Sequence, residues 1–285
     1  MSSDESPAPE SWIGRAEQVA DEATRAPALA LAATLDRDAS GLERGDPLPP
    51  LWHWIYFTPK APAREIGADG HPRRGGFLPP VSLPRRMWAG GRREFRQPIR
   101  IGDALTRTST IADVRRREGR SGTLVFVTVR HEIGRDGLVL LTEEHDIVYR
   151  DLPRPDAPAP EPERAPTDES TARRVVPDPV LLFRYSALTF NGHRIHYDRS
   201  YVTEIEGYPG LIVHGPLIAT LLIGEAERQR PGLRVGRFEF KAVHPLFDVD
   251  PFEVCCRFGS GNGIDLWARD KEGRLAMQAR LEAAP

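Results

Sequence analysis

The chain has 285 residues, of which 40% are hydrophobic and 28% charged, and its formal net charge is -2. This composition is typical of a globular protein, and the charge does not indicate a nucleic-acid partner. No run approaches the roughly 18–20 apolar residues of a membrane helix, and the polar start MSSDESPAPE lacks the features of a signal peptide. We therefore expect a cytoplasmic protein with no nucleic-acid or membrane partner.

The first part of the chain predicts an opening helix, a short apolar segment and an antiparallel meander. A helix-like run ends in AATLD at 32–36, and the aromatic run LWHWIYF follows at 51–57. Strand-like runs lie near 104–115, 122–133 and 138–149. The glycine-containing segments between them are typical of hairpin turns.

A Pro-rich segment divides the chain. Residues 151–169 read DLPRPDAPAPEPERAPTDE, a composition that cannot build a core and is typical of a semi-rigid linker. We therefore expect an N-terminal domain at 1–150, a linker at 151–175 and a C-terminal domain at 176–285. Both domains are of ordinary size.

The second part repeats the pattern of the first. A helix-like run ends in ALTFN at 187–191, and a segment that is apolar nearly all round, Ile212–Ala226, predicts a helix buried against a sheet. Strand-like runs follow near 251–258, 263–269 and 274–282. The adjacent cysteines, Cys255 and Cys256, would point to opposite faces of a strand, so we expect two reduced, packed thiols.

Two matched landmarks support an internal repeat. Each part has a predicted strand opening in Glu-Phe and a basic residue, at 94–96 and at 239–241, and an Asp eight residues after the Phe, at Asp103 and Asp248. Both Asp residues have the character of turn residues. The repeat predicts a sheet wrapped around one helix, formed twice in a single chain.

The densest polar cluster lies in the second part. Residues 189–198 read TFNGHRIHYD and residues 207–216 read GYPGLIVHGP, which places three histidines and an asparagine within 24 residues. This cluster precedes the N-terminus of the buried helix, where free N–H groups and the helix dipole suit a developing oxyanion. A neutral imidazole suits proton transfer.

These segments resemble a known family. The runs ALTFNGHRIHYD and EGYPGLIVHGPL resemble the MaoC-like, type 2 hydroxyacyl-thioester dehydratases. The first part, with SWIGRAE, PLPPLWHWIYF, GHPRRGGFLPPVSLPRRMWAGG and GRSGTLVFVTVRHEI, resembles the N-terminal dehydratase domain related to type I fatty-acid synthase. The resemblance covers the chain except for its first ten residues and the linker. It implies an α+β fold of two hot-dog folds in tandem, each an antiparallel sheet wrapped around a central helix.

The resemblance also assigns residues. The family motif has an Asp followed five positions later by a His, and a His-Gly pair at the start of the central helix. His196 fits the catalytic His, and Gly215 fits the residue whose N–H helps to form the oxyanion hole. Asn191 holds the Asp position and cannot act as a base near neutral pH, so we expect it to orient water or substrate. His193 would then supply part of what the Asp gives.

Other candidates carry two interpretations each. His214 and Tyr197 are expected beside the substrate, with a helix cap and a surface position as their respective alternatives. Asn191 has the alternative of a turn residue. Paired arginines are either solvated or bind the phosphates of coenzyme A; they are Arg73-Arg74, Arg85-Arg86 and Arg92-Arg93. The aromatic residues Trp52, Trp54 and Tyr56 belong to the core or line an acyl pocket.

The first repeat lacks the polar cluster. Thr34 and His53 are 19 positions apart, whereas Thr189 and His214 are 25 apart, and the missing segment is where the loop histidines lie. We therefore expect a degenerate first domain that shapes the acyl pocket, and one active site per chain. His193 and His196 lack carboxylate or thiol neighbours in sequence, so we expect no metal and no cofactor.

These assignments predict a hydro-lyase: an acyl-thioester hydratase/dehydratase that adds water reversibly to an enoyl-CoA. By resemblance, the substrate is a branched C5 dicarboxylyl-CoA such as mesaconyl-C4-CoA or itaconyl-CoA, because abundant Arg suits a free carboxylate. A 3-hydroxyacyl-ACP dehydratase of fatty-acid synthesis is the first alternative. A hot-dog thioesterase and a non-catalytic acyl-CoA-binding protein are the others. The substrate partner is acyl-CoA or acyl-ACP, and the chain is a monomer or a homodimer.

Overall fold

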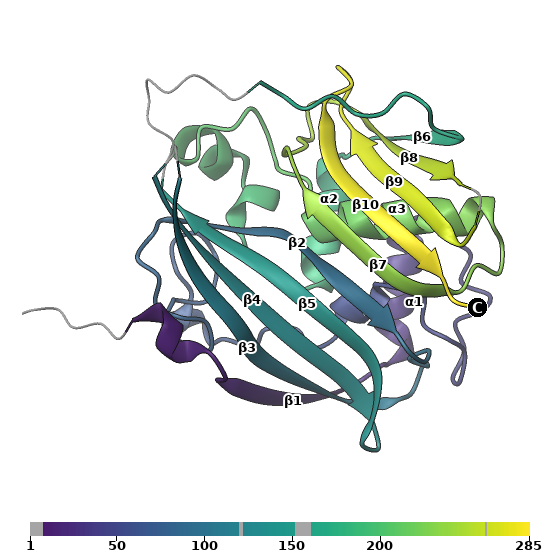
Figure 1. Ribbon diagram of the computed structural model, residues 1–285, viewed down its shortest axis with the longest axis horizontal. Coiled ribbons are helices and arrows are strands. Elements are labelled where there is room, and N and C mark those ends of the chain that lie inside the picture. The colour runs from purple at the N-terminus through teal and green to yellow at the C-terminus, as the bar shows by residue number, and fades with distance from the viewer. Residues whose placement is uncertain (1–7, 120–121, 152–160, 260) are drawn as a thin grey trace, which may run out of the picture.

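A computed structural model describes residues 8–119, 122–151, 161–259 and 261–285. Within these residues, ten strands form one antiparallel sheet in the order β1-β3-β4-β5-β2-β7-β10-β9-β8-β6 (Figure 1). The first half contributes β1 (Ala16–Glu22), β2 (Arg85–Phe95), β3 (Ala104–Gly119), β4 (Gly122–Arg135) and β5 (Leu138–Arg150). The second half contributes β6 (Thr171–Val175), β7 (Val235–Ala242), β8 (Phe252–Phe258), β9 (Gly263–Arg269) and β10 (Leu275–Ala283).

The order of the strands shows the internal repeat. The first half runs 1-3-4-5-2 across the sheet, and the second half runs 6-8-9-10-7 in the opposite direction. The halves join where β2 pairs antiparallel with β7, with Arg92 opposite Glu239 at the centre of the register. The predicted repeat is therefore present as two equivalent half-sheets.

Three α-helices lie on the inner face of the sheet (Figure 1). They are α1 (Arg25–Thr34), α2 (Pro179–Leu188) and α3 (Gly215–Gln229), and α1 and α2 contact each other. The long helix α3 packs on β8, β9 and β10 and buries apolar side chains, such as Leu217 and Leu222, on several sides. This burial accounts for its apolar sequence, because no side of the helix faces water over most of its length.

Short helices complete the described chain. They are the 3-10 turns Pro9–Trp12, Trp52–Ile55, Ala63–Glu65 and Arg194–His196, and the π-helical turn Tyr201–Ile205. Along the chain, the turn Trp52–Ile55 follows α1 in the first half as α3 follows α2 in the second. Among the described residues, no helix is long and apolar enough to cross a membrane.

Several element boundaries differ from the sequence prediction. Glu94 and Phe95 end strand β2 rather than opening a strand, and Glu239 lies in the middle of β7. The buried helix begins three residues later than predicted, at Gly215, because 212–214 remain extended and His214 is its N-cap. Cys255 and Cys256 are free and buried, as expected.

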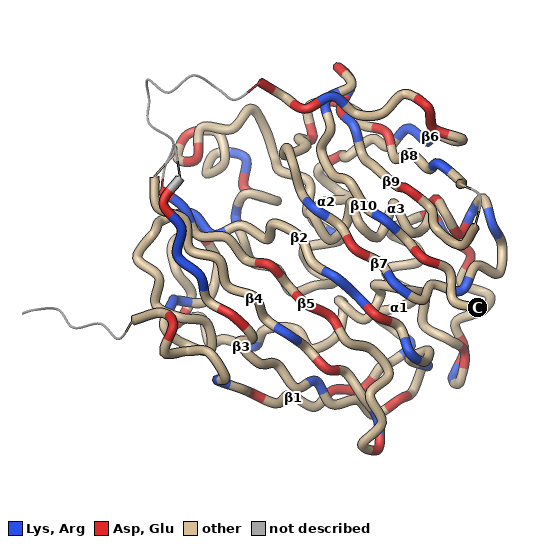
Figure 2. Tube along the Cα trace, viewed as in Figure 1, with Lys and Arg blue, Asp and Glu red and all other residues tan. Residues whose placement is uncertain are grey.

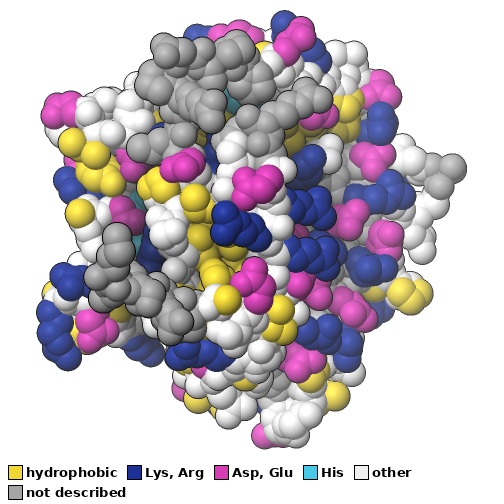
Figure 3. Space-filling model, turned by 60° about the vertical axis from the view of Figure 1, so that its left-hand side comes forward, with side chains coloured by type: hydrophobic (Ala, Val, Ile, Leu, Met, Phe, Trp, Pro, Cys, Tyr) yellow, Lys and Arg dark blue, Asp and Glu magenta, His cyan; other side chains and the backbone are white. Residues whose placement is uncertain are grey.

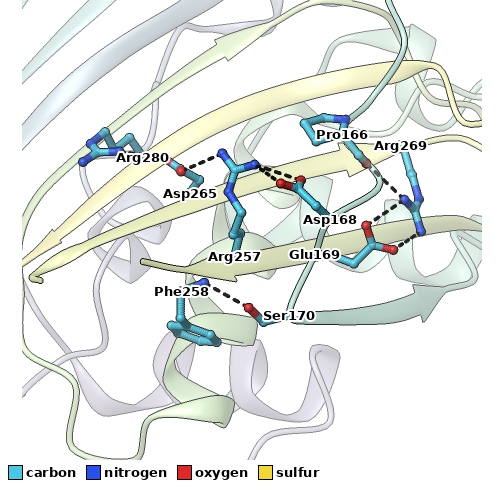
Figure 4. A network of polar contacts seen from close by, with 9 residues as sticks. All are labelled: Pro166, Asp168, Glu169, Ser170, Arg257, Phe258, Asp265, Arg269 and Arg280. Carbon is cyan, nitrogen blue, oxygen red and sulfur yellow. Dashed lines mark hydrogen bonds and ion pairs between the residues drawn. The ribbon is translucent and has the colours of Figure 1, made fainter. Parts of the chain in front are cut away.

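Strand β6 lies within the range that the sequence predicts as linker. It pairs with β8, and the residues before it are held to the outer face by ion pairs (Figure 4). Arg257 contacts Asp168 at 2.7 Å and Asp265 at 2.9 Å, and Arg269 contacts Glu169 at 2.6 Å. The C-terminal half-sheet therefore begins before residue 176.

Charged side chains cover the outer face of the sheet. Basic and acidic residues alternate between neighbouring strands (Figure 2), and the space-filling view shows the two signs interspersed (Figure 3). Arg92, for example, contacts Glu144 at 2.8 Å and Asp146 at 2.9 Å. On the described part of this face, residues of both signs are paired across strands.

Candidate active site

The polar loop predicted from the sequence begins where α2 ends. Phe190 has a left-handed backbone (φ 50°), and the N–H of Asn191 bonds to the Ser186 carbonyl at 2.8 Å, which turns the chain out of the helix. The side-chain oxygen of Asn191 then accepts the N–H of His193 at 3.1 Å. Asn191 therefore forms an Asx turn, the alternative role that its residue type allowed.

His196 lies buried at the end of this loop. Its Nδ1 is 2.7 Å from the carbonyl oxygen of Ile212, and the N–H of Ile212 bonds back to the Ile195 carbonyl at 3.0 Å. A carbonyl oxygen can only accept, so Nδ1 carries the proton and Nε2 keeps its lone pair. Burial lowers the pKa of His196 to about 4, against the raising effect of the Ile212 carbonyl. The ring is therefore a neutral base at physiological pH.

His214 stacks on His196 at the start of α3. The two ring centroids are 3.7 Å apart with an interplanar angle of 18°. His214 Nε2 lies 2.8 Å from the Ser186 hydroxyl, while its Nδ1 is buried and has no partner among the described residues. Burial holds the pKa of His214 well below its usual value. His214 is thus both the helix N-cap and a neighbour of the proposed base.

Gly215 is the first residue of α3, and its N–H belongs to the helix turn that has no intrahelical acceptors. A Cβ added at this glycine would meet only the Met277 Cε, at 4.0 Å. The space on the Cβ side of Gly215 is therefore open. The structure places this N–H, for which the described residues provide no acceptor, and the positive end of the helix dipole next to the stacked pair of histidines.

A turn of the first half closes over this loop, and sequence reasoning did not anticipate it. The N–H of Arg194 bonds to the Asp69 carbonyl at 2.9 Å, and the His71 ring lies 4.0 Å from the His193 ring, centroid to centroid. His193 also meets His196 edge to face at 5.6 Å. His71, His193, His196 and His214 form what we call the histidine row. The only sequence signal was the run GHPRRGG, which carried family resemblance but no assigned role.

Tyr197 lies apart from the row. Its side chain is 44% exposed, and its hydroxyl donates to the Gly192 carbonyl at 2.9 Å. The next residue, Asp198, binds the guanidinium of Arg194 at 2.8 Å and caps the N–H of Tyr201 at 3.0 Å. Tyr197 is therefore at the surface, its alternative interpretation.

A second buried polar cluster occupies the first half. The Glu143 carboxylate, 3% exposed, contacts His53 at 3.1 Å, Trp54 at 3.1 Å, Arg93 at 3.3 Å and His145 at 3.0 Å. Burial alone would raise the pKa of Glu143, but the neighbouring histidines outweigh it and hold the pKa well below its usual value. Glu143 is therefore ionised and pairs with a fully buried guanidinium.

The fold and this loop first define a class. Two half-sheets, each with its own inner face and joined edge to edge, are the double hot-dog arrangement. A solved protein of Mycobacterium tuberculosis described as a double hot-dog fold has a TM-score of 0.63 at 14% identity. The match covers 95% of this chain and 96% of that one. The predicted fold class is therefore confirmed.

The family follows from three further matches. The family model "Hydroxyacyl-thioester dehydratase type 2" matches residues 51–248. "Mesaconyl-C(4)-CoA hydratase" of Chloroflexus aurantiacus is 49% identical over 272 residues, 95% of this chain and 96% of that protein. "Hydroxyacyl-thioester dehydratase type 2, mitochondrial" of Schizosaccharomyces pombe is 27% identical over 78% of this chain and 82% of that protein. The chain belongs to the type 2 hydroxyacyl-thioester dehydratase family, which confirms the predicted hydratase/dehydratase activity, a hydro-lyase reaction on an acyl thioester.

Proposed function

We propose that the protein adds water reversibly to the double bond of a branched C5 dicarboxylyl-CoA of the mesaconyl-C4-CoA type, with one active site at the histidine row. The observation that carries this proposal is the geometry of His196. Its Nδ1 proton is fixed on the Ile212 carbonyl, which leaves the lone pair on Nε2, and its ring stacks on His214, the N-cap of α3. The likeness to the Chloroflexus hydratase over nearly both whole chains supports the choice of substrate.

The residues divide the reaction between a base and an oxyanion site. His196 Nε2 accepts a proton from water as the oxygen bonds to Cβ, and the π electrons of the double bond move toward the thioester carbonyl. The N–H of Gly215 stabilises the oxygen of the resulting enolate. The imidazolium of His196 then returns the proton to Cα, so the enzyme ends unchanged. Dehydration is the reverse.

His196 meets the requirement for both proton transfers because it is neutral before the reaction begins. His214 supports it by stacking, and Ser186 in turn fixes the His214 ring. The amide nitrogen of Asn191 remains available for water or the substrate hydroxyl, because the Asx turn uses only the oxygen. His193 lies at the edge of His196.

An arginine that forms no ion pair with the described residues supports a substrate with a second carboxylate. Arg86 of β2 is half-buried and lies opposite Tyr149 in the pairing with β5. The pKa of His193 is lowered to about 2, mainly by burial and then by nearby charges that include His71 and Arg86. Arg86 therefore lies near the histidine row. Within the described residues Arg86 forms no ion pair, whereas Arg85 and Arg92 do. A guanidinium beside the site without a protein carboxylate suits a substrate carboxylate.

A 3-hydroxyacyl-ACP dehydratase is the second candidate, favoured by the likeness to the Schizosaccharomyces protein. The same residues would remove water from a 3-hydroxyacyl chain. The substrates distinguish the two, because a neutral acyl chain offers no carboxylate to Arg86.

The test is the change in enoyl-thioester ultraviolet absorbance with a panel of crotonyl-, mesaconyl-, itaconyl- and longer enoyl-CoA. We expect turnover of the dicarboxylyl thioesters, and a loss of at least about 100-fold in His196→Ala, the low end for a lost acid–base group. His244→Ala, a histidine outside both polar clusters, is the matched control. Turnover restricted to long neutral chains would refute the substrate, and release of free thiol would identify a thioesterase instead.

A further inference from the structure

The first half reaches the active-site loop through a turn built for close contact. Gly70 has φ +88°, and a Cβ there would lie 1.8 Å from the Gly192 carbonyl oxygen. Only glycine allows both this backbone and this approach. Arg194 donates its N–H to the Asp69 carbonyl and its guanidinium to the Ala68 carbonyl at 3.0 Å. The turn at 67–71 is therefore fixed against the loop by its backbone, which leaves its side chains free to serve the site.

Those side chains form a carboxylate–imidazole pair. Asp69 lies 3.2 Å from His71 Nδ1 through one oxygen and accepts the His71 N–H at 3.0 Å through the other. The bond to His71 is the main reason that the pKa of Asp69 lies well below its usual value. An ionised carboxylate can only accept, so Nδ1 of His71 carries the proton and Nε2 keeps its lone pair. Burial lowers the pKa of His71, so the ring is neutral.

The active-site loop itself lacks a carboxylate at the position that the family motif reserves for one. Asn191 stands there, and its oxygen is committed to the N–H of His193. The structure places Asp69 of the other half against the same row, one ring away from His193. The Asp69 carboxylate is therefore linked through the His71 ring to the active-site loop, and this loop carries the amide of Asn191 where the family motif has a carboxylate.

We propose that Asp69 and His71 complete the acid–base site from the first half, with His71 holding the reacting water for His196. This inference rests on the proposed function. The water donates one O–H to His196 Nε2 and the other to His71 Nε2. The first O–H bond breaks as the C–O bond forms, and its proton passes to His196 and then to Cα. The second O–H stays intact in the product hydroxyl, so His71 gains and loses no proton.

Asp69 acts through His71 and is a positioning residue. Its charge fixes the tautomer that leaves Nε2 as the acceptor, as second carboxylates do in other imidazole bases. Removing the charge but not the shape, in Asp69→Asn, weakens a charge-assisted hydrogen bond to a neutral one. The first half therefore contributes to the chemistry and not only to the acyl pocket.

The experiment measures kcat and KM for His71→Ala, His71→Gln and Asp69→Asn, with His244→Ala as control. We expect His71→Ala to lower kcat about 100-fold, the order of a misplaced reactant, with KM little changed. Added imidazole should restore part of this loss, and Asp69→Asn should lower kcat about tenfold. Gln offers an acceptor oxygen, so His71→Gln should retain more activity than His71→Ala. A thermal transition near that of the wild type checks that each variant is folded.

Unchanged kcat in a folded His71→Ala, or equal losses in His71→Ala and His71→Gln without imidazole rescue, would overturn the proposal. So would activity that is lost on chelation and restored by zinc, because donor atoms of Asp69, His71 and His193 all lie within 4.8 Å and would then be metal ligands. Failure of the proposed function is distinguishable, because wild type and His196→Ala would both be inactive on every thioester. In that case the NMR titration of His71 still decides the pair: its pKa should fall further in Asp69→Asn, and an unchanged value would refute the pairing.

Discussion

Acidification tests the mechanism most directly, because the base is held neutral by burial. The pKa of His196 is about 4, whereas an exposed imidazole titrates near 6.5. At pH 5 about nine-tenths of His196 would therefore be neutral, against only about 3% of an ordinary histidine. The neighbours that face His196 are His71, His193 and His214, all with lowered pKa. We expect kcat/KM to stay near its plateau down to about pH 5 and to fall toward pH 4.

The same shift predicts a dependence of stability on pH. The folded-state pKa of His196 lies below the unfolded value, so the unfolded chain binds more protons between pH 6.5 and 4. The contribution of His196 to the free energy of unfolding is therefore complete above pH 6.5 and is lost as the pH falls through this window. A shift of about 2.5 units corresponds to about 3 kcal/mol from this one buried ring. The other members of the row add losses of the same sign.

The assay combines both readouts on one preparation. Initial rates of absorbance change give kcat/KM from pH 4 to 8, and urea unfolding at each pH gives the free energy of unfolding. His196→Gln, which cannot titrate, should flatten the stability profile in this window. An acid limb of kcat/KM centred near pH 6.5, with a flat stability profile in the wild type, would refute the assignment of His196 as a buried neutral base.

Three further changes have defined outcomes. Arg86→Gln should lower kcat/KM for dicarboxylyl thioesters by at least about tenfold, the effect of a lost charge-assisted bond, and leave crotonyl-CoA nearly unaffected; equal losses on both would contradict a carboxylate contact. Glu143→Leu should destabilise the fold by about 3–5 kcal/mol in urea unfolding because it leaves the buried charge of Arg93 unpaired, and the added change Arg93→Met should restore most of this loss. Gly70→Ala should lower kcat by more than its loss of thermal stability accounts for, because a Cβ there displaces the turn that carries His71. A kcat equal to that of the wild type would show that this turn does not position His71.

The elements of this fold were predictable because its hydrophobic patterns are local. The segment LIVHGPLIATLLIG is apolar nearly all round, and the structure forms α3, the most buried of the three α-helices, from its glycine at 215 onward. The meanders were predictable from their glycine-containing turns. The bounds of strand β2 were not predictable. Glu94-Phe95 resembles the matching pair in the second half, but it ends β2, and the position of this strand is set by its pairing with β5 and β7.

The candidate site was predictable only in part, for a physical reason. His196, His214 and Gly215 adjoin one another through a short loop and a helix start, which sequence spacing shows. Asp69 and His71 reach the loop from more than 100 positions away, through backbone contacts that no periodicity encodes. The buried Glu143 was equally hidden from the sequence. Glu144 follows it on the opposite face of β5, so both faces of the strand carry polar residues and the pattern does not show which one is buried.

The comparison of the two halves argues for one active site per chain. His53 lies in the turn that follows α1, and His214 lies at the start of the helix that follows α2, yet their surroundings differ in charge. His214 bonds to a neutral hydroxyl of Ser186 and stacks on a second imidazole, whereas His53 bonds to the ionised Glu143. That carboxylate is already shared with buried Arg93, so it cannot accept a proton from water without leaving a guanidinium charge unpaired in the core. The first half therefore uses its polar groups at His53 for its own fold, and its proposed contribution to the chemistry lies where it touches the other half, at His71.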